Sequence, residues 1–431
     1  MVLALGLCAC LDPIPPDTVT RPGAGEVGGI VTDLCTARPL SEVLVTPRTE
    51  DGNPATASQT DAAGRYLLQD LDQGNWRLMF STTGYQSVQQ TVGVVEGQLE
   101  PLDVALSPVP TQVPAQVTLD VLFVVDNSNS MAEEQQSLAS AFPSFMNTLL
   151  LYGLKLDLRV GVISTDLGAG NYGIPSCETA LGDGGKLQTK PRIAGCSVPA
   201  DPFISVVGTS TNVPDDMVND AFACIVQLGT GGCGFEQPLG AALRAIDGVS
   251  NPGFPRQGSA LAVVVISDED DCTAVNTQLY DPSQSSLTDP LGPLTSFRCF
   301  EFGVTCDIDD RETQGPRQGC VPRQGGYLLD VDAFVTQLQQ GRAPGQVFFG
   351  AIAGPTSKVA VGLAGGNPVL EPSCQTASTS AVPAIRLRAV TDRLSPQSAF
   401  ETICVDNLGG ALSSMAQQIA EKTIFSPCGA R

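Results

Sequence analysis

The chain has 431 residues, with 23 Lys and Arg against 45 Asp and Glu and a formal net charge of -22, and at about 150 residues per domain its length predicts two to three domains. The negative charge has the wrong sign for a surface that follows phosphates, so we expect no nucleic-acid partner. The sequence contains no histidine, which excludes Ser-His-Asp triads, Cys-His nucleophiles and histidine-ligated zinc.

The first ten residues, MVLALGLCAC, are a short apolar run followed by a polar, proline-rich stretch. They resemble the end of a bacterial lipoprotein signal, with Cys10 as the acylated residue and residues 11–25 as a tether. An ordinary secretion signal is the alternative. No later stretch has the roughly 18 consecutive apolar residues of a membrane helix. We therefore expect an exported protein of the bacterial outer membrane or cell surface, attached to the membrane through lipid.

The cysteines that follow Cys10 are even in number, widely spaced and without a C-x-x-C motif. This pattern favours disulfides in an oxidising compartment over zinc sites. Cys224 and Cys233 flank a glycine-rich loop and are expected to pair with each other. Cys35 stands apart from the other cysteines after Cys10, which all follow residue 170, so either it pairs across domains or two thiols stay free.

Residues 26–108 contain short β-rich runs separated by turn residues, which predict a small all-β sandwich. The expected strands are Val27–Thr32, Val43–Pro47, Gly64–Leu68, Trp76–Ser81 and Val88–Val95. Stretches such as VGGIVTD, PLSEVLVTP and TDAAGRYLLQDLDQGNWRLMF resemble the carboxypeptidase regulatory-like and Cna-B-like modules. Some relatives of this fold form Lys-Asn crosslinks, but the first lysine of this chain is Lys155. The resemblance therefore implies a stalk or spacer without an internal crosslink of that kind.

Residues 109–116, PVPTQVPA, predict a semi-rigid linker. In residues 117–425, apolar runs alternate with helical stretches, which predicts an α/β domain with a doubly wound, mostly parallel sheet. The expected strands are Thr118–Val125, Leu158–Ser164, Ala260–Ser267 and Gln346–Ala353, and the expected helices lie near 132–151, 214–227, 236–247, 330–340 and 407–422. Residues 166–213, 270–327 and 354–383 are polar and rich in cysteine, and we expect them to be disulfide-braced insertions without cores of their own.

The first strand of this domain ends in VLFVVDNSNSM, where Asp126, Ser128 and Ser130 form a D-x-S-x-S motif between strand and helix. A hard divalent cation prefers oxygen ligands, and this spacing lets two hydroxyls and one carboxylate approach a single ion. The motif resembles the metal-ion-dependent adhesion site (MIDAS) of the von Willebrand factor type A (vWA) domain, a Rossmann-like fold. The resemblance implies a Mg²⁺ site, with Mn²⁺ or Ca²⁺ as alternatives, and an open coordination position for a carboxylate from a partner.

Ligands of open α/β sheets gather beyond the C-terminal strand ends, where LAVVVISDEDD has Asp268 just past a buried strand. This residue matches the family's distal aspartate. The family's middle threonine corresponds to either Thr230 or Glu236 in LGTGGCGFEQPLGAAL, and the sequence leaves both open. Thr165 and Asp166 are further candidates on the same rim, whereas the acidic residues that follow Asp268 are expected to form a solvated loop.

The sequence thus favours an envelope or surface binding protein that uses a metal site to adhere to a protein or polysaccharide. A metal-free structural scaffold is the main alternative. A metal-dependent hydrolase using Asp126, Asp268 or Glu236 is a weaker alternative, because no candidate nucleophile or base stands apart from the proposed ligands. We therefore do not expect an enzyme.

Overall fold

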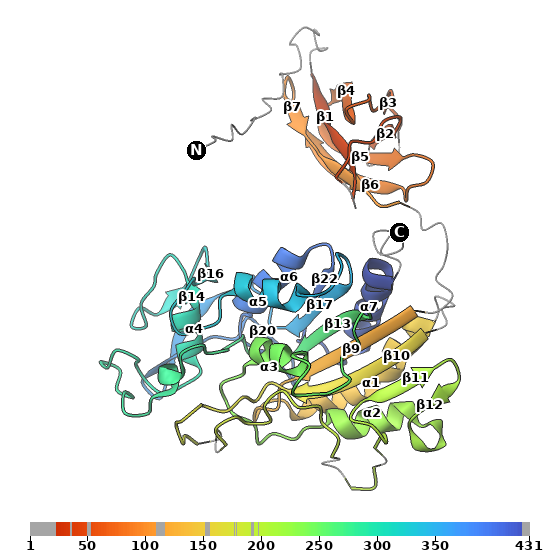
Figure 1. Ribbon diagram of the computed structural model, residues 1–431. Coiled ribbons are helices and arrows are strands. Elements are labelled where there is room, and N and C mark those ends of the chain that lie inside the picture. Colours follow the sequence, from red (N-terminus) through yellow and green to blue (C-terminus); the bar gives the residue numbers. More distant parts are fainter. Residues whose placement is uncertain are drawn as a thin grey trace, which may run out of the picture. The chain divides into compact units, whose positions relative to one another are not determined.

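The computed structural model describes residues 23–34, 37–49, 53–108, 117–150, 156–175, 177, 179–190, 194–196 and 198–424. The chain divides into two compact units, Met1–Thr111 and Gln112–Arg431 (Figure 1). Cys10 and Cys35 lie outside the described residues, so the predictions of lipidation and of Cys35 pairing stay predictions.

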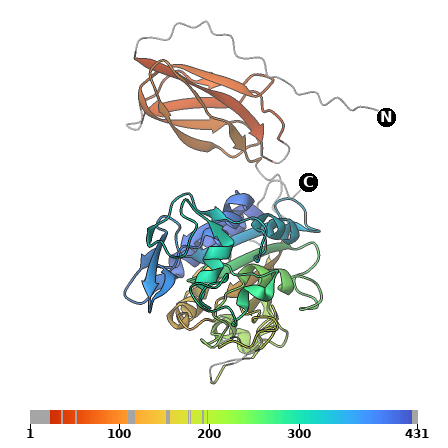
Figure 2. The ribbon, with the colours of Figure 1, turned by 90° about the vertical axis from the view of Figure 1, so that its left-hand side faces the viewer.

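The first unit contains a β-sandwich-like module of two sheets that share one hydrophobic core (Figures 1 and 2). One sheet has the order β4-β1-β7, with β8 also paired to β1, and the other has the order β3-β2-β5-β6. The strands are β1 (Ala24–Asp33), β2 (Leu44–Thr49), β3 (Ser58–Gln59), β4 (Arg65–Asp72), β5 (Gly74–Ser81), β6 (Val88–Val94), β7 (Leu99–Pro101) and β8 (Val104–Leu106).

Alternation along β5 explains how this module buries its core. Trp76, Leu78 and Phe80 are buried, whereas the residues between them are exposed, as expected for a strand with one face on the core. The ring of Tyr66 on β4 meets Phe80 edge-on at 5.4 Å between centroids. Each fully buried side chain of this size contributes roughly 1.5–3 kcal/mol. Gly64 adopts a φ of 73° before β4, and a Cβ there would lie 2.5 Å from the carbonyl oxygen of Val31, so the turn requires glycine.

The second unit is built on a seven-stranded sheet with the order β12-β11-β10-β9-β13-β17-β22. The five strands from β10 to β22 in this order run parallel, and β11 and β12 are antiparallel additions at one edge. The strands are β9 (Val117–Val125), β10 (Leu156–Ser164), β11 (Ile204–Val207), β12 (Ser210–Thr211), β13 (Ala260–Ile266), β17 (Val347–Ala353) and β22 (Ser398–Thr402).

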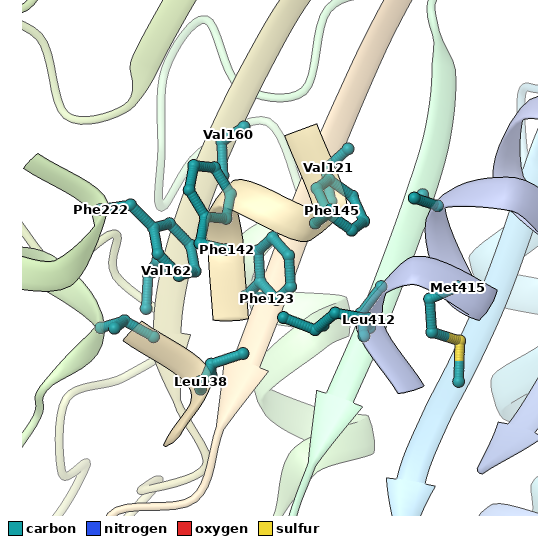
Figure 3. Packing of buried hydrophobic residues seen from close by; sticks show 14 of the residues in the cluster. Val121, Phe123, Leu138, Phe142, Phe145, Val160, Val162, Phe222, Leu412 and Met415 are labelled. Atoms are coloured by element: carbon teal, nitrogen blue, oxygen red, sulfur yellow. The ribbon is translucent and has the colours of Figure 1, made fainter. Parts of the chain in front are cut away.

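Helices cover both faces of this sheet, as the sequence predicts. Alternate strand residues pack either with α1 (Ala132–Leu150), α2 (Val218–Val226) and α7 (Gly409–Ile419), or with α3 (Pro238–Ala245), α5 (Val331–Gln339) and α6 (Ile385–Leu394). A π-helical turn, Ala420–Ile424, follows α7. In the first layer Phe123 of β9 lies among Phe142, Phe145 and Phe222 (Figure 3), and the Phe142 and Phe222 rings stack at 3.7 Å. This packing makes the central strands rigid supports for the loops that follow them.

Strands β11, β12 and β22 and helix α6 were not predicted, and one predicted insertion contains part of the sheet. Residues 166–213 do not form only an insertion, because their last part forms β11 and β12 and joins the sheet edge. The antiparallel pairing of β11 with β10 extends the sheet beyond its parallel part.

Five disulfides join cysteines in the part of the chain that the structure describes. The pairs are Cys177–Cys233, Cys196–Cys224, Cys272–Cys299, Cys306–Cys320 and Cys374–Cys404. The predicted Cys224–Cys233 bridge is therefore wrong, since each of these cysteines reaches into the 166–213 stretch instead. A native disulfide typically stabilises a fold by about 2–4 kcal/mol.

The insertions also form small cores, contrary to expectation. Ala169, Ile174, Leu279, Tyr280 and Leu328 cluster with four half-cystines between the first two insertions. The local elements are the 3-10 helices Pro214–Asp216 and Thr277–Tyr280, α4 (Phe297–Gly303), and the short strands β14 (Val304–Thr305), β15 (Gly315–Pro316), β16 (Val321–Pro322), β18 (Ala360–Ala364), β19 (Asn367–Leu370), β20 (Cys374–Gln375) and β21 (Ser380–Ala381). None of the helices in the described residues is long and apolar enough to cross a membrane.

Candidate functional site

The candidate site lies where the chain reverses direction in the sheet. From β9 the chain continues to its neighbour β10 on one side, whereas from β13 it continues to β17 on the other. Between β9 and β13 the loops therefore leave in opposite directions, which opens a crevice at the C-terminal strand ends. Asp126 follows β9, and Ser267 and Asp268 follow β13, so the two predicted aspartates lie on either side of this switch point.

Asp126 is fully buried and held by hydrogen bonds to both carboxylate oxygens. The backbone N–H of Ser128 donates to Oδ1 at 2.7 Å, and the Ser267 hydroxyl donates to Oδ2 at 2.7 Å. Burial raises the pKa of the carboxyl, and these hydrogen bonds oppose the rise. Ser128 and Ser130 hydroxyls lie 3.3 Å apart, with Ser130 exposed. The D-x-S-x-S motif thus presents two neighbouring hydroxyls beside a fixed carboxyl group.

The side-chain amide of Gln135 in α1 joins the loop of the D-x-S-x-S motif to the glycine-rich loop. Its Nε2 donates to the carbonyl oxygens of Asp126 and Gly229, both at 2.9 Å, and its Oε1 accepts from the Gly229 N–H. Gly232 N–H donates to the carbonyl oxygen of Asn127 at 2.8 Å, and a Cβ on Gly232 would clash with the Asn127 side chain. Gln135 was not singled out from the sequence, where it reads as an ordinary helical residue.

Asp268 is 5% exposed, and its Oδ1 is buried without a hydrogen-bond partner. Burial is the largest cause that raises its pKa to about 8, followed by repulsion from Asp126 and Glu269, and a hydrogen bond with Ser130 opposes the rise. The carbonyl oxygen of Asp268 accepts from Val382 N–H at 2.9 Å, which fixes the backbone. A buried carboxylate oxygen with no partner is costly, so this position is poised for a cation.

Glu236, which is buried, and Glu269, which is half-buried, form a second pair of acids beside Asp126. Burial and repulsion from Glu269 and Asp126 raise the pKa of Glu236 well above its usual range, and burial raises the pKa of Glu269 to about 7. Both carboxylate oxygens of Glu236 are buried without a hydrogen-bond donor, and the two neighbouring acids influence each other's ionisation. The Thr165 hydroxyl, fully buried after β10, also lacks a partner.

Glu134 in the first turn of α1 is a further acid that the sequence analysis missed. It is 3% exposed, its Oε2 has no partner, and its charge acts on Asp126 and Asp268. In the sequence, Glu134 is recognisable only as an acidic residue in the first turn of a helix, and such residues are common at helix N-termini.

Two of the other candidates have different surroundings. Thr230 is exposed, and no hydrogen bond found in the described part of the chain joins it to the aspartates, so the arrangement favours Glu236. Asp166 is half-buried and accepts from the Gly168 N–H at 2.8 Å, which makes it part of the turn that follows β10.

The acidic run after Asp268 is not a solvated loop, and that expectation was wrong. Asp270 accepts from the backbone N–H groups of Arg386 and Leu387 at the start of α6. Asp271 is fully buried and pairs with the buried guanidinium of Arg386 at 3.0 Å. These two acids anchor α6 to the sheet, whereas Asp268 and Glu269 face the cluster.

The oxygen atoms at this switch point match the preference of hard divalent cations rather than of soft metals. Across the described residues, no three His, Cys, Asp or Glu side chains converge in an arrangement that would hold a metal by themselves. Any ion would therefore need the serine hydroxyls and water beside at most two carboxylates. A cation would lower the raised pKa values by pairing with these acids.

Comparison with known proteins places the first unit in a family. Residues 26–107 match the carboxypeptidase regulatory-like domain, which confirms the resemblance read from the sequence. Among curated proteins, none matches the chain.

Solved structures with some similarity include pilins. The minor pilin GBS52 of Streptococcus agalactiae is 20% identical over 21% of this chain and 47% of its own, with a TM-score of 0.19. BcpA, the major pilin subunit of Bacillus cereus, is 18% identical over 22% and 34%, with a TM-score of 0.18. The shaft pilin SpaA of Lactobacillus rhamnosus GG is 12% identical over 21% and 47%, also at 0.18. The match spans less than half of each of these pilins, and such TM-scores carry no inference about function.

Proposed function

We propose that the protein is an exported envelope or surface binding protein. The carboxypeptidase regulatory-like module acts as a spacer, and a vWA-like domain binds a divalent cation and, through it, a carboxylate of a protein or polysaccharide. The disulfides support export, because such bridges persist in oxidising compartments. The strand order supports the vWA-like assignment, since it has a switch point flanked by Asp126 and Asp268.

One observation carries the cation proposal: the switch point holds buried acidic oxygens that have no hydrogen-bond partner. Oδ1 of Asp268 and both carboxylate oxygens of Glu236 are among them. Native proteins rarely bury such groups unpaired, and exceptions point to an ion or to a functional site. Asp126, Ser128, Ser130 and Asp268 would hold the ion, with Glu236 beside them. A set of so few protein oxygens suits Mg²⁺, which keeps several waters.

Calorimetric titration of a soluble form lacking residues 1–22 with Mg²⁺, Mn²⁺ and Ca²⁺ tests the proposal. We expect saturable binding of Mg²⁺, and its loss in Asp126→Ala with the fold retained by circular dichroism. Glu133→Gln is the matched control, because Glu133 is exposed on the same helical turn as the buried Glu134. Absence of binding in the wild-type protein, or equal binding in Asp126→Ala, would refute the site.

The metal-free scaffold is the second candidate, and the lack of a three-acid metal group in the described residues favours it. In that case the buried acids would stay protonated and the disulfide-braced insertions would form the contact surface. Adhesion to envelope material would then be unaffected by a chelator. The cation proposal requires that a chelator abolish this adhesion and that Mg²⁺ restore it.

A further inference from the structure

A cleft of about 1060 Å³ is lined by residues of α6, of the 317–324 stretch and of loop 355–359, none of which belongs to the candidate cation site. Its charge is opposite to that of the chain. Arg317, Arg388 and Arg393 are among its lining residues, and Asp392 is the acid among them. A positive cleft in a protein with a formal net charge of -22 concentrates anions locally.

Arg317 contributes a buried positive charge to the lining of the cleft. Its side chain is 4% exposed, and its guanidinium donates to the carbonyl oxygens of Gly315, Asp310 and Thr313. Within the described residues no carboxylate lies within ion-pair distance, and Asp310, which is exposed, acts on it only at longer range. Buried charges are normally compensated, and backbone carbonyl oxygens compensate this guanidinium, so its positive charge adds to the potential of the cleft.

Arg388 and Arg393 at the rim keep donors available for a ligand. Arg388 donates through Nε to Asp392 at 2.8 Å and lies 5.5 Å from the Phe400 ring centroid. Arg393 pairs through Nε with Asp332. In both ion pairs the aspartate side chain is more than half exposed. Exposed ion pairs of this kind contribute little to stability. Arg388 can therefore turn its Nη groups toward a carboxylate without a large cost, and Arg393 can turn its Nη2, since its Nη1 donates to the carbonyl oxygen of Ala389.

The rest of the lining fits a sugar chain. The amides of Gln318 and Gln324 and the hydroxyls of Thr356 and Ser357 lie around the cleft, with Phe400 as its aromatic residue. Amides and hydroxyls can donate to and accept from sugar hydroxyls, and guanidinium groups recognise acidic substituents in a bidentate manner. We propose that this cleft binds an acidic oligosaccharide, a chain of sugars bearing carboxylates, and that it does so without a metal ion.

Calorimetry with tetragalacturonate as the probe, on the soluble form lacking residues 1–22, tests this proposal. We expect saturable binding in the presence of a chelator, weakened by salt, and much weaker binding of the neutral maltotetraose. Arg388→Gln with Arg393→Gln should reduce the affinity at least about tenfold, equivalent to about 1.4 kcal/mol. Both residues are on the surface, so the double variant is expected to fold. Arg65→Gln, at an exposed ion pair in the module, is the control and should bind normally.

Three outcomes would overturn the proposal. The first is no binding of tetragalacturonate, or equal binding of maltotetraose. The second is tetraglutamate peptide binding as tightly, which would assign the cleft to acidic peptides. The third is loss of binding with chelator or in Asp126→Ala, which would assign the sugar to the cation site instead. Because the expected result does not depend on metal, failure of the cation proposal leaves this test intact.

Discussion

At the scale of single residues, the ionised carboxylate of Asp268 that would bind a cation also destabilises the metal-free fold. Its folded-state pKa of about 8 lies above the ordinary value of 3.8. A carboxyl whose folded pKa is raised binds more protons folded than unfolded, so stability is lost as pH rises from about 4 to about 8. Glu269, with a pKa raised to about 7, acts in the same direction.

We therefore expect the metal-free protein to unfold at a lower temperature near pH 8 than near pH 5. Asp268→Asn removes the charge with little change in shape, and it should stabilise the metal-free protein at the higher pH by about 1–3 kcal/mol. Thermal unfolding followed by circular dichroism measures both effects. Asp392→Asn, at an exposed acid on α6, is the control and should change little.

Saturating Mg²⁺ should reduce this pH dependence in the wild-type protein, because a bound cation keeps the carboxylates ionised. A wild-type protein whose stability rises between these pH values would contradict the raised pKa. The two aspartates were predictable because each follows an apolar strand. Glu134 was not, because an acid in the first turn of a helix is common and the sequence pattern does not reveal that this one is buried.

At the scale of elements, α6 is held by a buried ion pair in addition to its apolar face. Arg386 is buried in its first turn and pairs with Asp271 through Nε and Nη2. Removing one partner of a buried pair leaves the other charge uncompensated, which costs about 3–5 kcal/mol. Asp271→Asn should therefore destabilise the second unit by about this amount.

Urea unfolding monitored by helical circular dichroism would measure the loss, again with Asp392→Asn on the same helix as control. Where Asp271→Asn fails to fold, the double variant Asp271→Leu with Arg386→Met should restore folding, since an apolar pair can replace a buried ion pair. Equal stability of Asp271→Asn and the control would show that the carbonyl oxygens around Arg386 compensate for its charge.

This ion pair also explains what the sequence could not predict. The α6 segment IRLRAVTDRL has three arginines and reads as exposed, although Arg386 is fully buried. The adjacent edge strand β22, SAFET, is short and ends in polar residues. By contrast β13 and β17 are continuous apolar runs and β9 ends in one, and their strand assignments are confirmed with ends within two residues.

At the scale of the whole molecule, each unit has its own hydrophobic core. Disulfide connectivity was beyond prediction at this scale, because Cys177–Cys233 and Cys196–Cys224 join segments whose approach depends on how the insertions fold over the sheet. The linker prediction for 109–116 rests on composition, since its prolines lie between two sequence patterns of different period.

Separate cores predict separate unfolding, and the chain carries a probe for each unit. Trp76 is the chain's only tryptophan and is buried in the module core, whereas the helices of the described residues belong to the second unit. Tryptophan fluorescence should therefore report the module, and helical circular dichroism the α/β unit, in two distinct transitions. Because a ligand stabilises only the unit that binds it, Mg²⁺ should shift the helical transition and leave the fluorescence transition in place. Coincident transitions, or an equal shift in both, would mean that the units fold as one and that the module is more than a spacer.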